Sequence, residues 1–355
     1  MAAPIRVLHV AKSLGLGGTE KVMQLFATHL DRCGFQVAVH SPLDGPRGPL
    51  LRAAGIPTHI GADLFKTLCA WKPDVVHLHR AGWPEPGLLR PLAAARVPVV
   101  VETNVFGRHD PSPSAKVLDR TLFVSRFCAE RFAAHTGIPA EPPRYGVLYN
   151  PVATDFFARA CPPRDLSAPA AGRLSRPDPG KWSRLALDFL PLAAEALPGL
   201  RYRIVGGLPE AEEYVRTHGL EANAEFLPPL TSDEELAGFF NSISLLAHAN
   251  DTGESFGLAI AEAMAAGLPV VTHPCPEPRD NAQLELVEHG VTGLVARDTR
   301  EYAQAVIFLL THPEEARNMG EAGRAKAARL FRAQDLAARL GDIYREILAA
   351  KVLNR

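Results

Sequence analysis

Gly-Glu-Ser-Phe-Gly-Leu-Ala-Ile-Ala-Glu, residues 253–262, is the stretch that decides the fold class of this 355-residue chain. It follows an apolar run at 243–248 and opens a strongly helical sequence that reaches residue 267. A buried strand, a glycine-containing turn and a helix, in this order, form the repeating unit of parallel α/β sheets. Gly257 would let the backbone N–H groups of Phe256, Gly257 and Leu258 point at an anion bound at the start of the helix.

Two carboxylates frame this stretch, Glu254 and Glu262. If all of it were helical, they would lie roughly 12 Å apart along the axis and about 80° apart around it. They therefore cannot share one proton, but they can contact two parts of one extended ligand. A merely structural role is also open to Glu254: its charge complements the helix dipole, an interaction worth about 0.3–1 kcal/mol. Glu262, among Ala, Ile and Met, is costly to bury without a partner.

The same alternation of strands and helices extends to both halves of the chain. Apolar runs that predict strands lie at 5–11, 35–40, 74–79, 97–102, 120–125, 146–149, 201–205, 225–227, 243–248, 269–272 and 293–295. Helical segments lie between several of them, which predicts parallel sheets covered on both faces. We expect two doubly wound, Rossmann-like α/β domains that face each other across a cleft, with ligands at the carboxyl ends of the strands.

A proline-rich stretch separates the two halves. Six prolines between 151 and 180 are typical of a linker. An amphipathic helix is predicted at 336–348, where apolar residues recur at steps of four, three and four. We therefore expect an N-terminal domain at 1–150, a linker and first strand region at 151–180, a C-terminal domain at 165–330, and a helix within 331–355 that crosses back to the N-terminal domain.

Composition excludes several classes of protein. Hydrophobic residues at 47% and charged residues at 22% exclude a disordered chain, and a formal net charge of −1 argues against a nucleic-acid binder. The five cysteines are an odd number without a CxxC pair, which argues against a disulfide framework or a structural zinc site and favours a reducing cytosol. Nowhere do 18 apolar residues run together, so no transmembrane helix is expected; contact with a membrane surface stays open.

A glycine loop follows the first predicted strand, at residues 13–20. Its backbone N–H groups and the helix that begins near Thr19 could bind an anion, or the loop could be an ordinary tight turn. Glu20 stands where a dinucleotide-binding GxGxxG motif would have its last glycine, and the second strand ends in His40-Ser41 without an acidic residue. A nicotinamide-dependent dehydrogenase is therefore disfavoured.

Two basic residues flank a proline turn at the start of the second half. Arg173 and Lys181 could bind a diphosphate together, or they could belong to a solvated basic linker. The chain contains no DxD motif and no Walker lysine loop, so neither a metal-bridged diphosphate nor a P-loop is supported. His77 and His79 share one strand face, but two histidines without a third ligand are more often packing than a metal site.

A serine hydrolase is one alternative. Gly253-x-Ser255-x-Gly257 matches the nucleophile elbow, and the order Ser255, Asp280, His312 would suit a catalytic triad. The elbow should come straight off its strand, however, whereas residues 250–253 intervene here.

With these residues in view, the chain resembles the family 4 retaining glycosyltransferases of the GT-B fold. The resemblance is carried nearly end to end by six segments: Gly17-Gly18-Thr-Glu20, Asp74-Val-Val-His-Leu-His79, Val147-Leu-Tyr-Asn-Pro-Val152, Gly172-Arg173-Leu with Lys181, Glu254-Ser-Phe-Gly-Leu-Ala-Ile-Ala-Glu262, and Val287-Glu-His-Gly-Val-Thr-Gly-Leu-Val295. The fifth matches the family's E-x7-E motif in full and is the most specific. The third has Pro151 where the family has glycine.

The resemblance implies a UDP- or GDP-type nucleotide-sugar donor and a glycan, lipid-linked or small-molecule acceptor, with no metal and no cofactor. It further implies retention of the anomeric configuration, through front-face attack with the donor's own phosphate as the base. The roles it implies are a diphosphate clamp for Arg173 and Lys181, sugar contact for Glu254, ribose binding for Glu262, donor phosphate contacts for Ser255, Phe256, Gly257 and Leu258, and a further phosphate contact for Gly17 and Gly18.

One position departs from the family. A histidine often follows the strand at 97–102, close to the transferred sugar, whereas this chain has Asn104. Candidate sugar contacts are therefore Asn104, His109 and His79. A sugar-nucleotide epimerase of similar architecture stays open beside the glycosyltransferase, as does the hydrolase that would use Ser255. The expected location is cytoplasmic, with contact to the inner face of the membrane left open.

Overall fold

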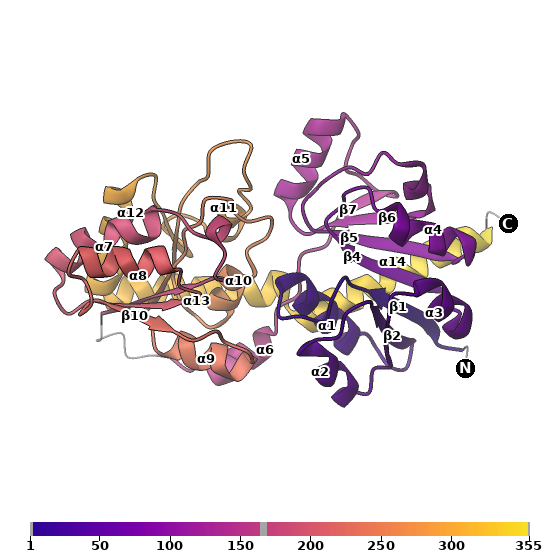
Figure 1. The fold of residues 1–355 in the computed structure, drawn as a ribbon, viewed down its shortest axis with the longest axis horizontal. Coiled ribbons are helices and arrows are strands. Elements are labelled where there is room, and N and C mark those ends of the chain that lie inside the picture. Colours follow the sequence, from indigo (N-terminus) through magenta and orange to yellow (C-terminus); the bar gives the residue numbers. More distant parts are fainter. Residues whose placement is uncertain (1–2, 164–168, 354–355) are drawn as a thin grey trace. The chain divides into compact units, whose positions relative to one another are not determined.

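The computed structural model describes residues 3–163 and 169–353, and the chain divides into two compact units (Figure 1). Unit 1 comprises the residues up to 151 and those from 333 onward, so it is discontinuous in sequence. The second, unit 2, comprises residues 152–332. Each unit is an α/β domain with its own parallel sheet.

Unit 1 contains a seven-stranded sheet in the order β3-β2-β1-β4-β5-β6-β7, with every neighbouring pair parallel. The strands are β1 Ile5–Val10, β2 Phe35–Ser41, β3 Thr58–Ile60, β4 Val75–Arg80, β5 Val99–Asn104, β6 Arg120–Phe123 and β7 Tyr145–Val147. The helices are α1 Gly18–His29, α2 Arg47–Ala53, α3 Leu64–Trp71, α4 Pro86–Ala94, the 3₁₀ helix η1 Pro113–Val117, α5 Arg126–Thr136 and α14 Ala333–Leu353.

Unit 2 contains a six-stranded parallel sheet in the order β10-β9-β8-β11-β12-β13. The strands are β8 Ala170–Leu174, β9 Arg201–Val205, β10 Ala224–Leu227, β11 Leu245–Ala247, β12 Val270–Thr272 and β13 Gly293–Val295. The helices are α6 Thr154–Ala160, the 3₁₀ helix η2 Pro179–Lys181, α7 Leu185–Ala196, α8 Pro209–Thr217, α9 Asp233–Asn241, α10 Leu258–Ala265, α11 Gln283–Leu286, α12 Thr299–Thr311 and α13 Pro313–Phe331.

The sheet of unit 1 is buried on both faces, as its near-continuous apolar strands require. Val7 and Val75 belong to a core that includes residues of α1 and α14, whereas Leu8 and Val76 belong to a core with residues of α3 and α4. Because successive side chains of a strand point to opposite faces, each central strand contributes to both cores. Leu340 of α14 is completely buried in the first core, so this late helix completes unit 1.

The structure corrects the expected boundary region. β8 is the first strand region expected within 151–180, whereas the helix α6 occupies residues that were expected to form a linker, and both belong to unit 2. Residues 164–168 of this stretch lie outside the described residues. The prolines hid α6, because Pro151 precedes this helix and Pro162 and Pro163 follow its end. The short strand β3 was also missed.

Three histidines form a buried stack on the sheet of unit 1. His9 of β1 lies beside His77 of β4, and His79 stacks on His77 with ring centroids 4.5 Å apart. His9 Nδ1 lies 3.0 Å from His79 Nε2, while His77 pairs with the Tyr344 hydroxyl of α14 at 2.5 Å and with Thr103 Oγ1 at 2.8 Å. His9 was not part of the sequence prediction.

This stack is the one cluster of potential metal ligands found among residues 3–163 and 169–353. Its rings lie within 15–28° of parallel. The nitrogen lone pairs of an imidazole lie in the ring plane, so the lone pairs of stacked rings do not converge on one ion. Burial lowers the pKa of all three histidines, that of His9 to about 3, which favours neutral rings held by hydrogen bonds.

These neutral histidines predict a pH-dependent stability of unit 1. Below pH 6.5 the unfolded chain binds a proton at His9, whereas the folded protein does so only near pH 3. The free energy of unfolding is therefore highest above pH 6.5. Below that pH, His9 lowers it by about 1.4 kcal/mol for each pH unit. We expect His9→Asn to reduce this slope by that amount in urea unfolding between pH 7 and pH 5. The exposed His218→Asn is the control, and an unchanged slope in His9→Asn would contradict the assignment.

Candidate active site

The candidate site of unit 2 lies where the strand order of its sheet reverses. The chain passes from β8 outward through β9 to β10 and then returns to β11 on the other side of β8. The loops that leave the carboxyl ends of β8 and β11 therefore diverge, and such switch points form the ligand crevice of open α/β sheets. Lys181 lies after β8 and Glu254 after β11, and the structure brings these two predicted residues together.

Lys181 and Glu254 form a partly buried ion pair. The ammonium nitrogen lies 3.2 and 3.1 Å from the two carboxylate oxygens, and the Glu254 side chain is 18% exposed. Glu254 Oε1 also accepts from Asn250 Nδ2 at 2.8 Å and lies 3.2 Å from His248 Nε2. Burial alone would raise the pKa of Glu254, but His248 and Lys181 outweigh it and lower the pKa to about 2. The carboxylate is therefore ionised at neutral pH.

Arg173 faces inward rather than toward solvent. Its residue is 2% exposed, and its guanidinium donates to the carbonyl of Ala249 at 2.5 Å and to the carbonyl of Lys181. The guanidinium also stacks on Trp182, 4.1 Å from the ring centroid, and burial lowers its pKa. Arg173 thus ties together the two loops that carry Lys181 and Glu254. The predicted pair of accessible cations is, in this structure, one accessible lysine braced by a buried arginine.

The predicted turn stands at the start of α10. Gly257 adopts φ +98°, a conformation that favours glycine, and the helix begins at Leu258. Ser255 and Phe256 precede the turn, and the Phe256 ring is buried against Phe331. Glu262 lies on α10 and is 4% exposed. Glu254 therefore belongs to the loop before the helix, and the two glutamates do not share one helix.

A second segment supports this loop from beside it. The Glu254 backbone N–H donates to Gln283 Oε1 at 3.1 Å, and the Ala282 N–H donates to the Glu254 carbonyl at 2.9 Å. Gly253, with φ +68°, packs against the Asp280 carbonyl so closely that a Cβ would overlap it. His248, Asn250 and Gln283 were missed by sequence reasoning, because isolated polar residues after a strand carry no spacing signal.

In unit 1, the glycine loop at residues 13–20 packs against the side chain of Glu20. Gly17 is the N-cap of α1, which begins at Gly18, and a Cβ on Gly17 would overlap the Glu20 carboxylate. Glu20 Oε1 accepts from Ser13 Oγ at 2.8 Å, so this side chain braces the loop. The loop follows β1, beside the point where the strand order of this sheet reverses between β1 and β4.

The three candidate sugar contacts differ in their surroundings. The Asn104 amide donates to the Arg108 carbonyl at 2.8 Å and accepts from the Arg108 N–H at 3.2 Å, so it closes its own loop. His109 is exposed and contacts the Phe132 ring edge-on. His79 belongs to the buried histidine stack described above. Among the described residues, no hydrogen bond ties the His109 side chain into its loop, in contrast to Asn104.

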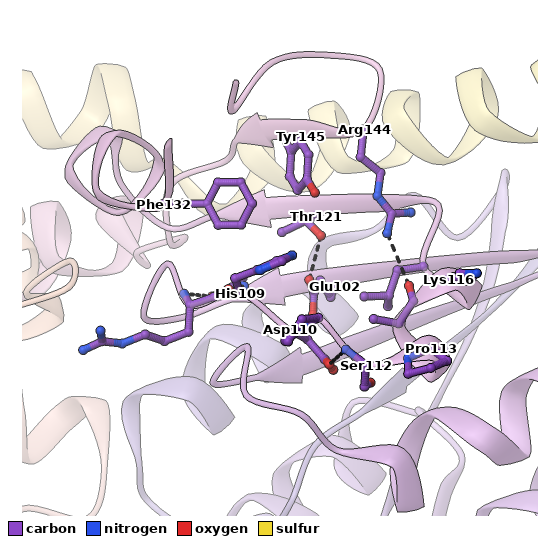
Figure 2. Close-up of a pocket in the computed structure, with 15 residues that line it drawn as sticks. Glu102, His109, Asp110, Ser112, Pro113, Lys116, Thr121, Phe132, Arg144 and Tyr145 are labelled. Atoms are coloured by element: carbon purple, nitrogen blue, oxygen red, sulfur yellow. Dashed lines mark hydrogen bonds between the residues drawn. The ribbon is translucent and has the colours of Figure 1, made fainter. Parts of the chain in front are cut away.

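Asn104 and His109 line a pocket of about 330 Å³ within unit 1 (Figure 2). Arg144 and Tyr145 approach it from one side and His109 and Asp110 from the other. Asp110 and Glu102 are both paired with the buried Arg80, at 3.2 and 2.5 Å. Arg80 also donates to the carbonyl of Trp83, so one guanidinium fixes the loops that follow β4 and β5.

Residues 169–312, most of unit 2, match the family Glycosyl transferases group 1. The chain is 31% identical over 249 residues to the GDP-mannose-dependent alpha-(1-6)-phosphatidylinositol monomannoside mannosyltransferase of Mycobacterium tuberculosis. That match covers 66% of this chain and 63% of the relative, so the chain spans less than two thirds of the relative's length.

Two solved structures share the fold of nearly the whole chain. HepE of Anabaena, solved with UDP and glucose, has a TM-score of 0.77 at 19% identity and covers 96% of this chain and 100% of its own. A glycosyltransferase from Rickettsia africae has a TM-score of 0.80 at 16% identity and covers 98% and 99%. The predicted fold, two Rossmann-like α/β domains, is confirmed by these two structures, and the family match lies within unit 2. Among the described residues, no helix combines the length and the apolar character needed to cross a membrane.

The close approach at Gly253 predicts a selective loss of stability on substitution. Gly219 has nearly the same backbone conformation, φ +65°, but open space around its missing Cβ. Gly219→Ala should lower the free energy of unfolding by about 1–2 kcal/mol, because alanine is strained at a positive φ. Gly253→Ala should cost about 1–3 kcal/mol more, because the Asp280 carbonyl must move. Urea unfolding of both variants measures the difference. Equal losses of stability would contradict the prediction, because they would show that the Asp280 carbonyl moves aside without cost.

Proposed function

We propose that this protein is a retaining, metal-independent glycosyltransferase that moves a sugar from a nucleotide-sugar donor, bound by unit 2, to a hydroxyl group. The observation that carries the proposal is the Lys181–Glu254 pair at the switch point of the sheet, beside the turn that opens α10. A cation, a carboxylate and a helix N-terminus suit a sugar linked to a diphosphate.

The chemistry follows from where charge develops. As the bond between the sugar's anomeric carbon and the phosphate oxygen breaks, its electron pair passes to the departing nucleoside diphosphate. Lys181 and the N–H groups of Phe256, Gly257 and Leu258 would stabilise this negative charge more in the transition state than in the ground state. The acceptor oxygen would attack on the face that the phosphate leaves, and its proton would pass to the departing phosphate oxygen.

The remaining predicted residues take supporting parts in this proposal. Glu254 would contact the sugar, Glu262 would accept from the ribose hydroxyls, and Ser255 would contact the phosphate. Arg173 would act as a positioning residue, because its hydrogen bonds hold the loops that carry Lys181 and Glu254. Gly17 and Gly18 would offer backbone N–H groups to the donor phosphate, as the family resemblance implies.

The names of related proteins support the substrate classes. The mycobacterial relative is named as GDP-mannose-dependent, and HepE was solved with UDP, so we propose a UDP- or GDP-type donor. The acceptor would be a glycan, a lipid-linked molecule or a small hydroxylated molecule. A cytoplasmic location belongs to the same proposal, and the described residues contain no disulfide.

The geometry does not support the alternative that the protein is a serine hydrolase. Residues 248–257 separate the end of β11 from the start of α10, so Ser255 does not stand on a strand-to-helix elbow. His312 makes hydrogen bonds to Phe308 and Thr311 at the end of α12. A sugar-nucleotide epimerase would bind the same donor, and it is distinguished by turnover of the donor without any acceptor.

The test is donor binding without metal. We expect one class among UDP-, GDP-, TDP- and CMP-sugars to raise the melting temperature in EDTA by several degrees, since a ligand at 100 times its Kd adds about 2.7 kcal/mol. Glu262→Ala should abolish the shift, and Lys181→Met should weaken binding at least tenfold.

The exposed Glu314→Ala is the matched control and should bind as the wild type does. No shift with any nucleotide-sugar would overturn the donor site. Loss of all turnover in Ser255→Ala, with nucleotide binding intact, would favour the hydrolase.

A further inference from the structure

His248 connects the Lys181–Glu254 pair to the sheet of unit 2. It directly follows β11, and its backbone N–H donates to the Val271 carbonyl of β12 at 2.8 Å. Its imidazole lies beside Thr272, the last residue of β12, with Nδ1 3.3 Å from Thr272 Oγ1. On the other edge of the ring, Nε2 lies 3.2 Å from Glu254 Oε1. The side chain is 7% exposed, so both nitrogens have their partners inside the protein.

The ionised carboxylate of Glu254 determines which nitrogen of this imidazole carries a proton. A carboxylate accepts hydrogen bonds and donates none, so His248 donates from Nε2. A hydroxyl group can donate or accept, so Thr272 suits Nδ1 whether the imidazole is neutral or protonated. His248 therefore donates to Glu254 in both of its charge states, and the ring cannot turn over without losing both bonds.

The two carboxylate oxygens of Glu254 have unequal surroundings. Oε1 accepts from Asn250 Nδ2 at 2.8 Å, and it lies 3.2 Å from both His248 Nε2 and Lys181 Nζ. Among the described residues, Oε2 contacts Lys181 alone, at 3.1 Å. A carboxylate oxygen offers about two lone-pair directions, so three donors saturate Oε1, whereas Oε2 can still accept from one more group.

We propose that His248 is a positioning residue of the donor site: its bond to Oε1 fixes the plane of the Glu254 carboxylate and leaves Oε2 to accept from a hydroxyl group of the transferred sugar. This inference rests on the proposed function and deepens it, because it assigns one carboxylate oxygen to the protein and the other to the sugar. His248 itself does not contact the donor. Without its bond the carboxylate can turn, and the contact with the sugar weakens while the N–H groups at the start of α10 still bind the diphosphate.

Two substitutions separate the two edges of the imidazole. The amide nitrogen of glutamine reaches about as far as Nε2 of histidine, and that of asparagine about as far as Nδ1. His248→Gln should therefore keep the bond to Glu254, whereas His248→Asn should keep only the bond to Thr272. Both variants replace the ring by a neutral amide, so His248→Gln is the matched control for loss of the ring.

The experiment measures the affinities for UDP-glucose, UDP, GDP-mannose and GDP by calorimetry in EDTA. For the nucleotide that the wild type binds, we expect His248→Asn to weaken binding of the nucleotide-sugar by about tenfold or more, as for loss of a hydrogen bond to a charged group. Binding of the nucleoside diphosphate alone should change by less than about twofold. His248→Gln should bind both ligands as the wild type does, to within about threefold.

A double-variant cycle tests whether His248 acts through Glu254. In the Glu254→Ala background, His248→Asn should weaken nucleotide-sugar binding no further, because the carboxylate that it positions is absent. Thr272→Val leaves His248 in place and removes the hydroxyl that holds Nδ1, so it tests the same network should His248→Asn fail to fold. It should weaken nucleotide-sugar binding by about threefold or more, with nucleoside diphosphate binding unchanged, whereas the exposed Thr217→Val should change neither.

Three results would overturn the proposal. Equal losses for nucleotide-sugar and nucleoside diphosphate, in His248→Asn or in Thr272→Val, would show that His248 only stabilises the loop. Equal losses in His248→Gln and His248→Asn would show that the ring matters and not its bond to Glu254. A further tenfold loss in the double variant would show that His248 acts independently of Glu254. If the wild type binds none of the four nucleotides, the UDP- or GDP-type donor site fails, and this inference fails with it.

Discussion

The ion pair between Lys181 and Glu254 is the interaction on which the candidate site depends. It joins the loops of two central strands that the topology of the sheet sends in opposite directions. Arg173 reinforces this junction, because its guanidinium donates to one backbone carbonyl in each of the two loops. Removing one partner of such a partly buried pair is destabilising, because the charge that remains loses its counter-ion. This junction therefore supports the loop before α10 together with the hydrogen bonds with Asn250, Ala282 and Gln283.

Unit 1 uses the same device at its own switch point. Arg80 is buried at the end of β4 and pairs with Glu102 and Asp110, which belong to β5 and the loop after it. In both units a buried arginine at the end of a central strand fixes the neighbouring loop through charge-assisted hydrogen bonds. The polar groups at both switch points are in this way held by hydrogen bonds within the protein.

The sequence predicts the class of fold, because strands buried on both faces leave apolar runs and glycine turns that are visible without a structure. Its resemblance to a known family places both Lys181 and Glu254 at the donor, but their ion pair was not predicted, because the two residues lie in different loops. It does not predict that Arg173 points inward, since a charged residue after a strand reads the same whether it is buried or exposed. His9 escaped notice for a related reason: only the register between β1 and β4 brings it to His77.

The helix α14 has a consequence for how the chain is made. Its residues Leu340 and Tyr344 lie in the same core as Phe26 and Leu30 of the first strand–helix unit, some three hundred positions earlier. On the ribosome, the core of unit 1 stays incomplete until α14 has emerged, whereas unit 2 is by then already whole. Unit 2 can therefore fold first. The N-terminal part of unit 1 completes its core only after α14 has been synthesised, and until then part of its apolar surface stays exposed.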